Sequence, residues 1–179
     1  MDLFNKPELE RLIHIFATKI DGAGISGTIS LVGGAAISLS YLSDRQATSD
    51  IDALLPNDQI ISAIIAEMAI EENLVSNWIN DAAKAYVPFE TERQWVDLYR
   101  VGGVLVRIAS AELLLAMKLR ADRGLRDRTD IEELIKICGI TTMSEIEALY
   151  GGFHHQEVIK EKTRLVVIGM LKNNEVSDI

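Results

Sequence analysis

The spacing of apolar residues predicts that helices and strands alternate over residues 1–109. Apolar side chains recur at helical spacing in three segments, 7–20, 35–42 and 58–73. Short β-branched or alternating runs predict strands at 28–32, 51–55, 95–100 and 104–108, and the start of a further strand at 87–90. Gly102-Gly103 suits a hairpin turn between the last two full strands, and residues 74–85 are expected to form a short helix or an irregular segment.

Polar residues with capping character mark the expected helix ends. Asn5 is expected to cap the first helix, and Pro7 opens it because a first turn does not need the missing N–H group. From residue 110 onward only helical patterns appear, with helices expected at 111–123, 128–138, 146–150 and 154–172. The expected caps of the first three are Ser110, Asp127, and a capping box of Thr142 with Glu145.

These patterns predict an α+β fold, a small mixed sheet flanked by helices with a C-terminal helical part. Residues 1–109 would contain the sheet, and residues 110–179 would pack on it or continue it as one domain. A chain of 179 residues is long enough to bury a core of its own.

The composition excludes several classes of protein. The single cysteine, Cys138, rules out an internal disulfide and fits a reducing, cytoplasmic compartment. The chain does not open on a basic segment followed by an apolar core, and no apolar run approaches the roughly 20 residues of a membrane span, so no signal peptide or membrane association is expected. With 18 Lys and Arg against 27 Asp and Glu, the net charge of -9 argues against a protein that coats nucleic acid.

Two carboxylates stand close together on one predicted strand. Asp50 and Asp52 would project to one face, about 7 Å apart along the backbone, with Ile51 and Ala53 on the other. Like charges this close repel each other, and a divalent cation removes the conflict because hard cations prefer oxygen ligands. We therefore expect Asp50 and Asp52 to hold Mg²⁺ or Mn²⁺, with Asp97 from strand 95–100 as a third carboxylate.

A glycine pair precedes these carboxylates, between the predicted strand 28–32 and the helix 35–42. Without Cβ atoms, Gly33 and Gly34 let a phosphate approach the backbone, and the N-terminus of the following helix presents N–H groups with positive dipole character. One strand–helix–loop–strand unit would then supply both a phosphate site and a metal site. Three carboxylates with two metal ions suit in-line displacement at the α-phosphate of a nucleotide.

The order of motifs in residues 31–55 resembles the polymerase-β-like nucleotidyltransferase superfamily, in which a Gly-Gly or Gly-Ser pair is followed, after a spacer, by Asp-apolar-Asp. The resemblance covers most of residues 30–135. Further motifs resemble a bacterial branch that holds uncharacterised nucleotidyltransferase-like domains and relatives of abortive-infection toxins: Arg45, Thr48, Trp78–Ala82, Leu114–Leu119, Asp127 and Asp130.

The resemblance implies a nucleotidyltransferase palm that uses Mg²⁺ to move a nucleoside monophosphate from a nucleoside triphosphate to an acceptor hydroxyl. In the toxin branch the acceptor is often the tRNA 3′ end, and we keep a protein acceptor as a second expectation. The branch also depends on a helix Lys and a downstream Asp, which by motif position are Lys118 and Asp130. The chain would then be the toxin of a toxin–antitoxin pair, with an antitoxin protein as partner. The implied residues are Asp50, Asp52, Asp97 and Lys118 for catalysis, and Gly33, Gly34, Arg45, Thr48 and Asp130 for the substrate.

The positive charges of the chain gather in residues 107–128. This segment holds six of the 18 cations and three carboxylates, a local net charge of +3. Such a patch could bind a triphosphate or a short piece of RNA backbone on an otherwise acidic protein. The cations are Arg107, Lys118, Arg120, Arg123, Arg126 and Arg128.

Each motif also has a purely structural explanation. Asp50 and Asp52 could lie on a solvated strand, Gly33-Gly34 could form a simple turn, and Asp97 could face solvent or pair with a cation. Arg45 and Thr48 could only clamp the loop before the acidic strand.

Other residues have similar ordinary explanations. Lys118 and Asp122 are spaced as an i, i+4 surface ion pair. Cys138 is expected to be a buried structural thiol, and His154 to begin the last helix. For the whole chain, the alternative function is a non-catalytic protein that keeps the nucleotidyltransferase fold to bind a nucleotide or a partner.

Overall fold

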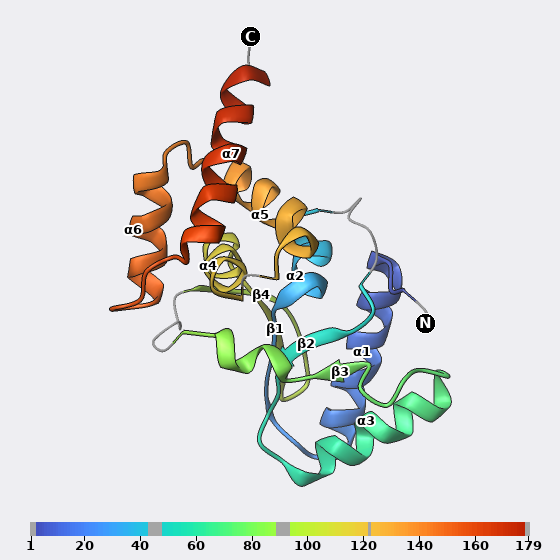
Figure 1. The fold of residues 1–179 in the computed structure, drawn as a ribbon. Helices are drawn as coiled ribbons and strands as arrows, with labels where there is room; N and C mark the ends of the chain where they lie inside the picture. Colours follow the sequence, from blue (N-terminus) through green and yellow to red (C-terminus); the bar gives the residue numbers. More distant parts are fainter. Residues whose placement is uncertain (1–2, 43–47, 89–93, 122, 178–179) are drawn as a thin grey trace. The chain divides into compact units, whose positions relative to one another are not determined.

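The structure is a computed structural model, and it describes residues 3–42, 48–88, 94–121 and 123–177 (Figure 1). The strands are β1 (Gly27–Leu31), β2 (Ile51–Leu54), β3 (Ile79–Asn80), β4 (Trp95–Val101) and β5 (Val104–Ala109). The helices are α1 (Lys6–Gly22), α2 (Gly33–Ser40), α3 (Gln59–Glu71), α4 (Ala111–Ala121), α5 (Leu125–Ile137), α6 (Met143–Phe153) and α7 (Glu161–Ser177), with a 3₁₀ helix η1 (Ala82–Tyr86). The α+β class with a mixed sheet flanked by helices is confirmed.

The five strands form one sheet in the order β3-β2-β1-β5-β4. The central strand, β1, runs antiparallel to β2 and parallel to β5, while β2 runs parallel to β3 and β4 antiparallel to β5. Because β1 carries the chain directly into α2, the start of that helix lies at the same end of the sheet as the start of β2.

The chain divides into two compact units. The first contains Met1–Ala85 and Trp95–Ala109, and it holds the whole sheet with α1, α2 and α3. The second contains Tyr86–Gln94 and Ser110–Ile179, and it holds α4, α5, α6 and α7. The change from mixed to purely helical structure thus falls at residue 110, where the sequence pattern also changes.

The first unit is built around the apolar face of α1. Asn5 and Glu8 form a capping box at the start of this helix, which confirms Asn5 as its cap. The buried face of α1 packs against β4, β5, α2 and α3, and Figure 1 shows α1 and α3 near each other beside the sheet. Trp78 is fully buried and meets Phe16 edge to face, with the ring centroids 5.7 Å apart. These contacts hold the edge of the sheet formed by β2 and β3 against the helices.

The strands β4 and β5 form the predicted hairpin around Gly102-Gly103. Gly102 has φ +50°, and a Cβ at this position would overlap the carboxylate of Asp21. The N–H group of Gly103 donates to Asp21 Oδ1 at 2.8 Å, so the end of α1 supports the turn. A register shift between Asp97 and Tyr99 interrupts the ladder within β4.

Most expected elements of the first unit are confirmed, with small shifts at their ends. The short strand β3 was not predicted, because two residues carry no periodic pattern and pair only where β2 lies beside them. Val87 and Pro88 are not in a strand, and residues 89–90 lie outside the described residues. The predicted strand start at 87–90 is therefore wrong where it is described.

The second unit confirms two expected helix caps and corrects the starts of three helices, since α6 begins at Met143, three residues before the predicted start at residue 146. Ser110 caps α4, since its hydroxyl accepts from the N–H group of Leu113 at 3.2 Å, and Thr142 forms a capping box with Glu145 at α6. Asp127 does not cap α5. That helix begins three residues before the predicted start, at Leu125, with Gly124 as its N-cap at φ +66°.

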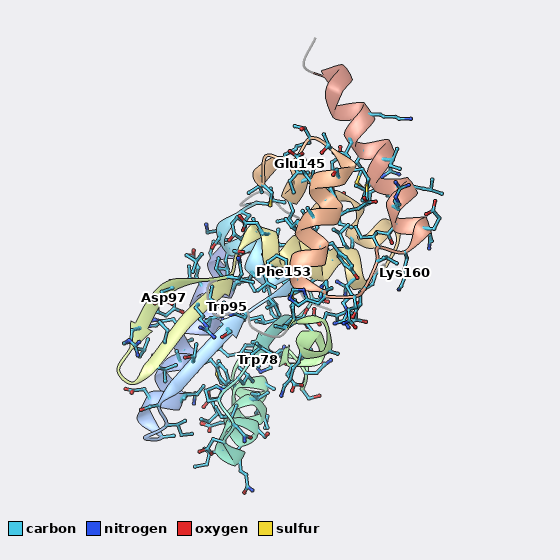
Figure 2. The ribbon with its side chains drawn as sticks, turned by 90° about the vertical axis from the view of Figure 1, so that its left-hand side faces the viewer. Trp78, Trp95, Asp97, Glu145, Phe153 and Lys160 are labelled. Carbon is cyan, nitrogen blue, oxygen red and sulfur yellow. The ribbon has the colours of Figure 1, made fainter. Side chains whose placement is uncertain are left out.

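The last helix begins later than predicted, whereas α5 begins earlier. His154 is the C-cap of α6 instead of a helix start, and α7 begins at Glu161. Gln156 has φ +67°, a left-handed backbone that ends helical geometry. Figure 2 shows Phe153 at the end of α6 and Lys160 just before α7. The two longest helices, α1 and α7, have 17 residues each, and no described helix is both long and apolar enough to cross a bilayer.

Candidate metal and phosphate site

The acidic pair, Asp50 and Asp52, lies at the start of β2. Buried and half-buried residues alternate along this strand, as expected. Ile51 and Ala53 are fully buried on the core side, whereas Asp52 and Leu54 are half-buried on the opposite side. Asp50 stands in a bend one residue before the strand and is also half-buried. The Ser49 hydroxyl lies 3.4 Å from Asp50 Oδ1. The carboxylates therefore remain accessible to solvent while the residues between them build the core.

Asn80 brings a polar side chain to both carboxylates. It pairs in register with Asp52 across the parallel β2–β3 ladder, and residues paired in this way share a face of the sheet. Its amide nitrogen lies 3.5 Å from Asp50 Oδ2, and its oxygen accepts from the N–H group of Ala82 at 2.9 Å. The acidic pair and Asn80 thus lie together, which supports the expected common face. Asn80 belongs to the Trp78–Ala82 motif, but no pattern predicts β3, so its place beside Asp50 could not be expected.

Gly33 stands directly beside Asp52. The antiparallel register pairs Leu31 with Ala53, and the next N–H group, that of Val32, donates to Asp52 O at 3.0 Å. Gly33 follows with φ +64° as the first residue of α2, and a Cβ there would overlap Asp52 Oδ2 and lie 3.2 Å from Asp52 Cβ. Only glycine fits this position, because both the backbone conformation and the space exclude a side chain.

The first turn of α2 lies beside Asp52 as well. Its N-cap, Val32, forms no side-chain cap, and Gly34 in the first turn is half-buried. The first N–H groups of an α-helix have no partner within the helix, and the helix dipole makes this end electropositive. The structure therefore brings Gly33 and Gly34 together with Asp52, as a combined phosphate and metal site requires.

Thr48 is held in place ahead of the acidic pair. Its backbone forms an isolated bridge with Phe4, and its hydroxyl donates to the carbonyl oxygen of Asp50 at 3.1 Å. This hydroxyl therefore fixes the bend that precedes β2, as the clamp interpretation expects. Arg45 lies outside the described residues.

Asp97 is not brought to the acidic pair. It lies on β4, the far edge of the sheet, and both β5 and β1 stand between β4 and β2. Three strand spacings correspond to about 14 Å, which is too far for three Asp side chains to share one metal pair. Figure 2 shows Asp97 on the hairpin and Trp78 elsewhere, next to β3. Asp97 is exposed and pairs in register with Arg107.

Arg107 lies on β5, the strand between β4 and β1. Its Nε donates to Ser30 Oγ at 2.8 Å, and its guanidinium lies over the Trp95 ring, 4.7 Å from the ring centroid. Because Arg107 pairs in register with Ser30 and Asp97, all three side chains share one face of the sheet. The Arg107 guanidinium therefore binds side chains of neighbouring strands in the sheet.

Lys118 and Asp130 contact each other inside the helical unit. The Lys118 ammonium donates to Asp127 Oδ1 at 2.6 Å and to Asp130 Oδ2 at 2.8 Å, and all three side chains are at most 5% exposed. The alternative i, i+4 pair with Asp122 lies outside the described residues. The described partners of Lys118 lie one helix further along the chain. The two residues singled out by the resemblance therefore form one buried ion pair, shared with Asp127.

Arg123 completes this cluster from the surface. Its Nε donates to Asp127 Oδ2 at 2.8 Å, and its side chain is 44% exposed. Burial by itself raises the pKa of Asp127, but the hydrogen bonds from Arg123 and Lys118 outweigh it, so the pKa lies below its ordinary value. Asp127 therefore serves as an ionised anchor between two cations.

Most of the described cations in the expected patch are bound to other side chains of the protein. Lys118 and Arg123 bind Asp127, Arg120 binds Glu157 at 2.8 Å, and Arg107 binds Ser30. Arg126 has no described side chain. The local charge of residues 107–128 thus stabilises the fold more than it forms an open anion-binding surface.

Asp50 and Asp52 fit an open Mg²⁺ site that water and substrate complete, and they do not fit a closed site made only of protein ligands. Within the described ranges, no three His, Cys, Asp or Glu side chains are placed to share a metal ion, so a closed protein cage is not formed. Mg²⁺ commonly takes one or two carboxylates and completes its shell with water and substrate phosphate. Asp50 and Asp52, half-buried beside a helix N-terminus, match this donor set.

Comparisons with known proteins gave no relatives for this chain. No family model matches it, and neither a curated protein nor a solved structure is significantly similar.

Proposed function

We propose that the protein is a metal-dependent nucleotidyltransferase that moves a nucleoside monophosphate from a nucleoside triphosphate to an acceptor hydroxyl. The observation that carries the proposal is the contact between Gly33 and Asp52. It joins an electropositive helix N-terminus to a pair of accessible carboxylates, which is the combination that a metal-bound triphosphate requires. The order of motifs in the sequence supports the same activity.

Each part of the site has a defined task in this proposal. Asp50 and Asp52 hold Mg²⁺, and the first-turn N–H groups at Gly33 and Gly34 donate to a phosphate of the nucleotide. Bound Mg²⁺ would supply charge neutralisation for the triphosphate and its pyrophosphate leaving group. The acceptor oxygen forms a bond to the α-phosphorus while the bond to pyrophosphate breaks, and the proton of the acceptor hydroxyl passes to solvent water. Asn80 and Thr48 are positioning residues, since they contact Asp50 through its side chain and its backbone.

Lys118 has a different task from the one expected. Its ammonium is enclosed by Asp127 and Asp130, so in this state it organises α4 and α5 and does not present a charge to solvent. The dependence on a Lys and an Asp that the resemblance implies would then arise through the folding of the helical unit. Proposed acceptors are the tRNA 3′ end or a protein hydroxyl.

The test is transfer of label from α-³²P nucleoside triphosphates in the presence of Mg²⁺ and total RNA. We expect labelling by the native chain and none by Asp50→Asn or Asp52→Asn. Asp81→Asn is the matched control, because this exposed carboxylate lies near the site in sequence but, among the described residues, its side chain forms no hydrogen bond or ion pair with the acidic pair. Asp97→Asn should retain labelling, since Asp97 lies on the far edge of the sheet.

Two results would contradict the proposal. The first is the absence of any labelled RNA, protein or small molecule together with no metal-dependent nucleotide binding. The second is equal labelling by the native chain and by Asp52→Asn. Nucleotide binding that needs Asp52 but yields no transfer would favour the alternative of a non-catalytic nucleotide-binding protein.

A toxin role is proposed as the physiological setting and has its own test. Expression of the native chain should arrest growth, whereas expression of Asp50→Ala to the same level should not. Arrest by both variants would show that a catalytic toxin is not the cause.

A further inference from the structure

We propose that the pocket between the start of α5 and the first turns of α7 binds a small organic phosphate, a phosphomonoester dianion attached to an apolar group the size of one ring. All residues that form this pocket belong to the helical unit. The inference therefore stands apart from the proposed transfer reaction at Asp50 and Asp52.

The walls of the pocket are mostly apolar, and the pocket as a whole is of ring size. Its volume is about 160 Å³, and Ile131 from α5 and Val166 from α7 contribute to its walls. An apolar cavity of about 150 Å³ holds a benzene ring in a well-studied protein. An apolar group of this size would displace water from the walls, which is favourable in proportion to the area covered.

The anion would lie at the N-terminus of α5. This 13-residue helix has Gly124 as its N-cap, so it has no side-chain cap of its own. The Lys162 ammonium lies 4.0 Å from the position that a Cβ on Gly124 would occupy. A cation from α7 thus stands over the electropositive end of α5, and an anion between them would relieve the repulsion.

A second cation lines the same pocket. Arg128 is exposed on α5, and within the described part of the chain neither Arg128 nor Lys162 forms an ion pair. This distinguishes them from Arg123 and Lys118, which are bound to carboxylates. Two available cations with a helix N-terminus favour a dianion over a monoanion.

Thr163 provides an independent sign of a missing polar partner. This residue lines the pocket and is only 4% exposed, and its hydroxyl has no hydrogen-bond partner among the described residues. Buried hydroxyl groups in folded proteins nearly always have a partner. A phosphate oxygen in the pocket would be an acceptor for this hydroxyl.

The Asp127 carboxylate in the pocket wall does not oppose the proposal. Asp127 is already bound by Lys118 and Arg123, at 2.6 Å and 2.8 Å. Its charge is therefore compensated inside the helical unit before any ligand arrives, and Arg128 and Lys162 remain as cations of the pocket wall that no described carboxylate binds.

The test uses phenyl phosphate as the probe with the full chain, by isothermal titration calorimetry and by NMR shifts of Gly124 and Thr163. We expect phenyl phosphate to bind at least tenfold more tightly than inorganic phosphate, which lacks the ring, and than phenol, which lacks the charge. Lys162→Gln and Arg128→Gln should each weaken binding by roughly tenfold. Lys172→Gln is the matched control, because Lys172 is exposed on the same helix ten residues further along.

The hydroxyl of Thr163 is tested by a pair of variants. Thr163→Ser keeps the hydroxyl and should keep the affinity, whereas Thr163→Val keeps the shape and should weaken phenyl phosphate binding. Asp52→Asn should bind phenyl phosphate like the native chain, which separates this site from the proposed transfer site.

Three results would overturn the inference. They are the absence of phenyl phosphate binding to the folded chain, equal affinities in Lys162→Gln and Lys172→Gln, and equally tight binding of phenol and phenyl phosphate. Circular dichroism of each variant ensures that a loss of binding is read only from folded protein.

Discussion

The backbone of Gly33 packs directly against the carboxylate of Asp52, because the β1–β2 register places the start of α2 beside the start of β2. Neither residue would form a site alone. A carboxylate on a strand is common, and so is a glycine at a helix start. Their contact is what brings a potential metal ligand within reach of the electropositive end of a helix.

Replacing Gly33 by alanine should disturb both stability and the site. Its φ of +64° and the overlap of a Cβ with Asp52 Oδ2 make the variant less stable by about 1–3 kcal/mol, measured by urea unfolding. Mg²⁺-dependent ATP binding should fall further than the loss of stability explains. Gly151→Ala is the control, because Gly151 is helical with open space around it. This variant should be more stable than the native chain by about 0.5–1 kcal/mol. A fully stable Gly33→Ala variant would contradict the geometry described.

Removing the Lys118 ammonium should strongly destabilise the helical unit. Lys118→Met leaves the Asp130 carboxylate buried without its described cation, and the expected loss in the free energy of unfolding is about 3–5 kcal/mol. Adding Asp130→Asn should recover part of it. Lys136→Met breaks an exposed pair with Glu133 and should cost under about 1 kcal/mol. Equal losses in the two single variants would show that burial of Lys118 does not matter.

Asp127 should contribute to stability in a manner that depends on pH. Because Arg123 and Lys118 hold its pKa in the folded state below the ordinary value, its contribution is complete above the pKa of the unfolded chain, about 3.9. The contribution disappears as the pH falls through the folded-state pKa. Asp127→Asn should therefore be clearly less stable than the native chain at neutral pH, and the difference should shrink in acid. Urea unfolding across this range measures it, and a difference that does not change with pH would refute the assignment.

Cys138 should react slowly with alkylating reagents while the chain is folded. Burial, with a smaller effect of Glu112, raises the pKa of this thiol to about 11, so little thiolate exists near neutral pH. At about pH 8, iodoacetamide should modify Cys138 at least a hundredfold more slowly than it modifies glutathione. The rates should become similar in concentrated urea. Rapid modification of the folded chain would contradict the raised pKa of this half-buried thiol.

Local signals in the sequence predicted the elements whose ends are built from neighbouring residues. The Asn5–Glu8 and Thr142–Glu145 capping boxes act over three residues, and the Gly102-Gly103 turn joins strands that follow each other directly. These interactions form within a short segment, so their residue types identify them. The alternation of Ile51, Asp52 and Ala53 likewise follows from the geometry of any strand with one buried face.

The helix start and the strand that the sequence patterns did not predict depended on contacts with residues outside their own segments. Asp127 has the composition of a helix cap, but Lys118 and Arg123 draw its carboxylate into a buried ion cluster, and α5 begins before it. The two-residue strand β3 exists only because β2 offers it a ladder, and it alone places Asn80 beside Asp50. No periodic pattern in the sequence could indicate either arrangement.

The sequence by itself determined the α+β class, most of the elements and the close spacing of Asp50 and Asp52, because these depend on residues a few positions apart. Only the tertiary structure decided which distant residues meet. The strand order β3-β2-β1-β5-β4 joins Gly33 and Asn80 to the acidic pair and leaves Asp97 on the opposite edge. Strand order and register are set by long-range packing, so a carboxylate on a correctly predicted strand could still lie three strand spacings away from its expected partners.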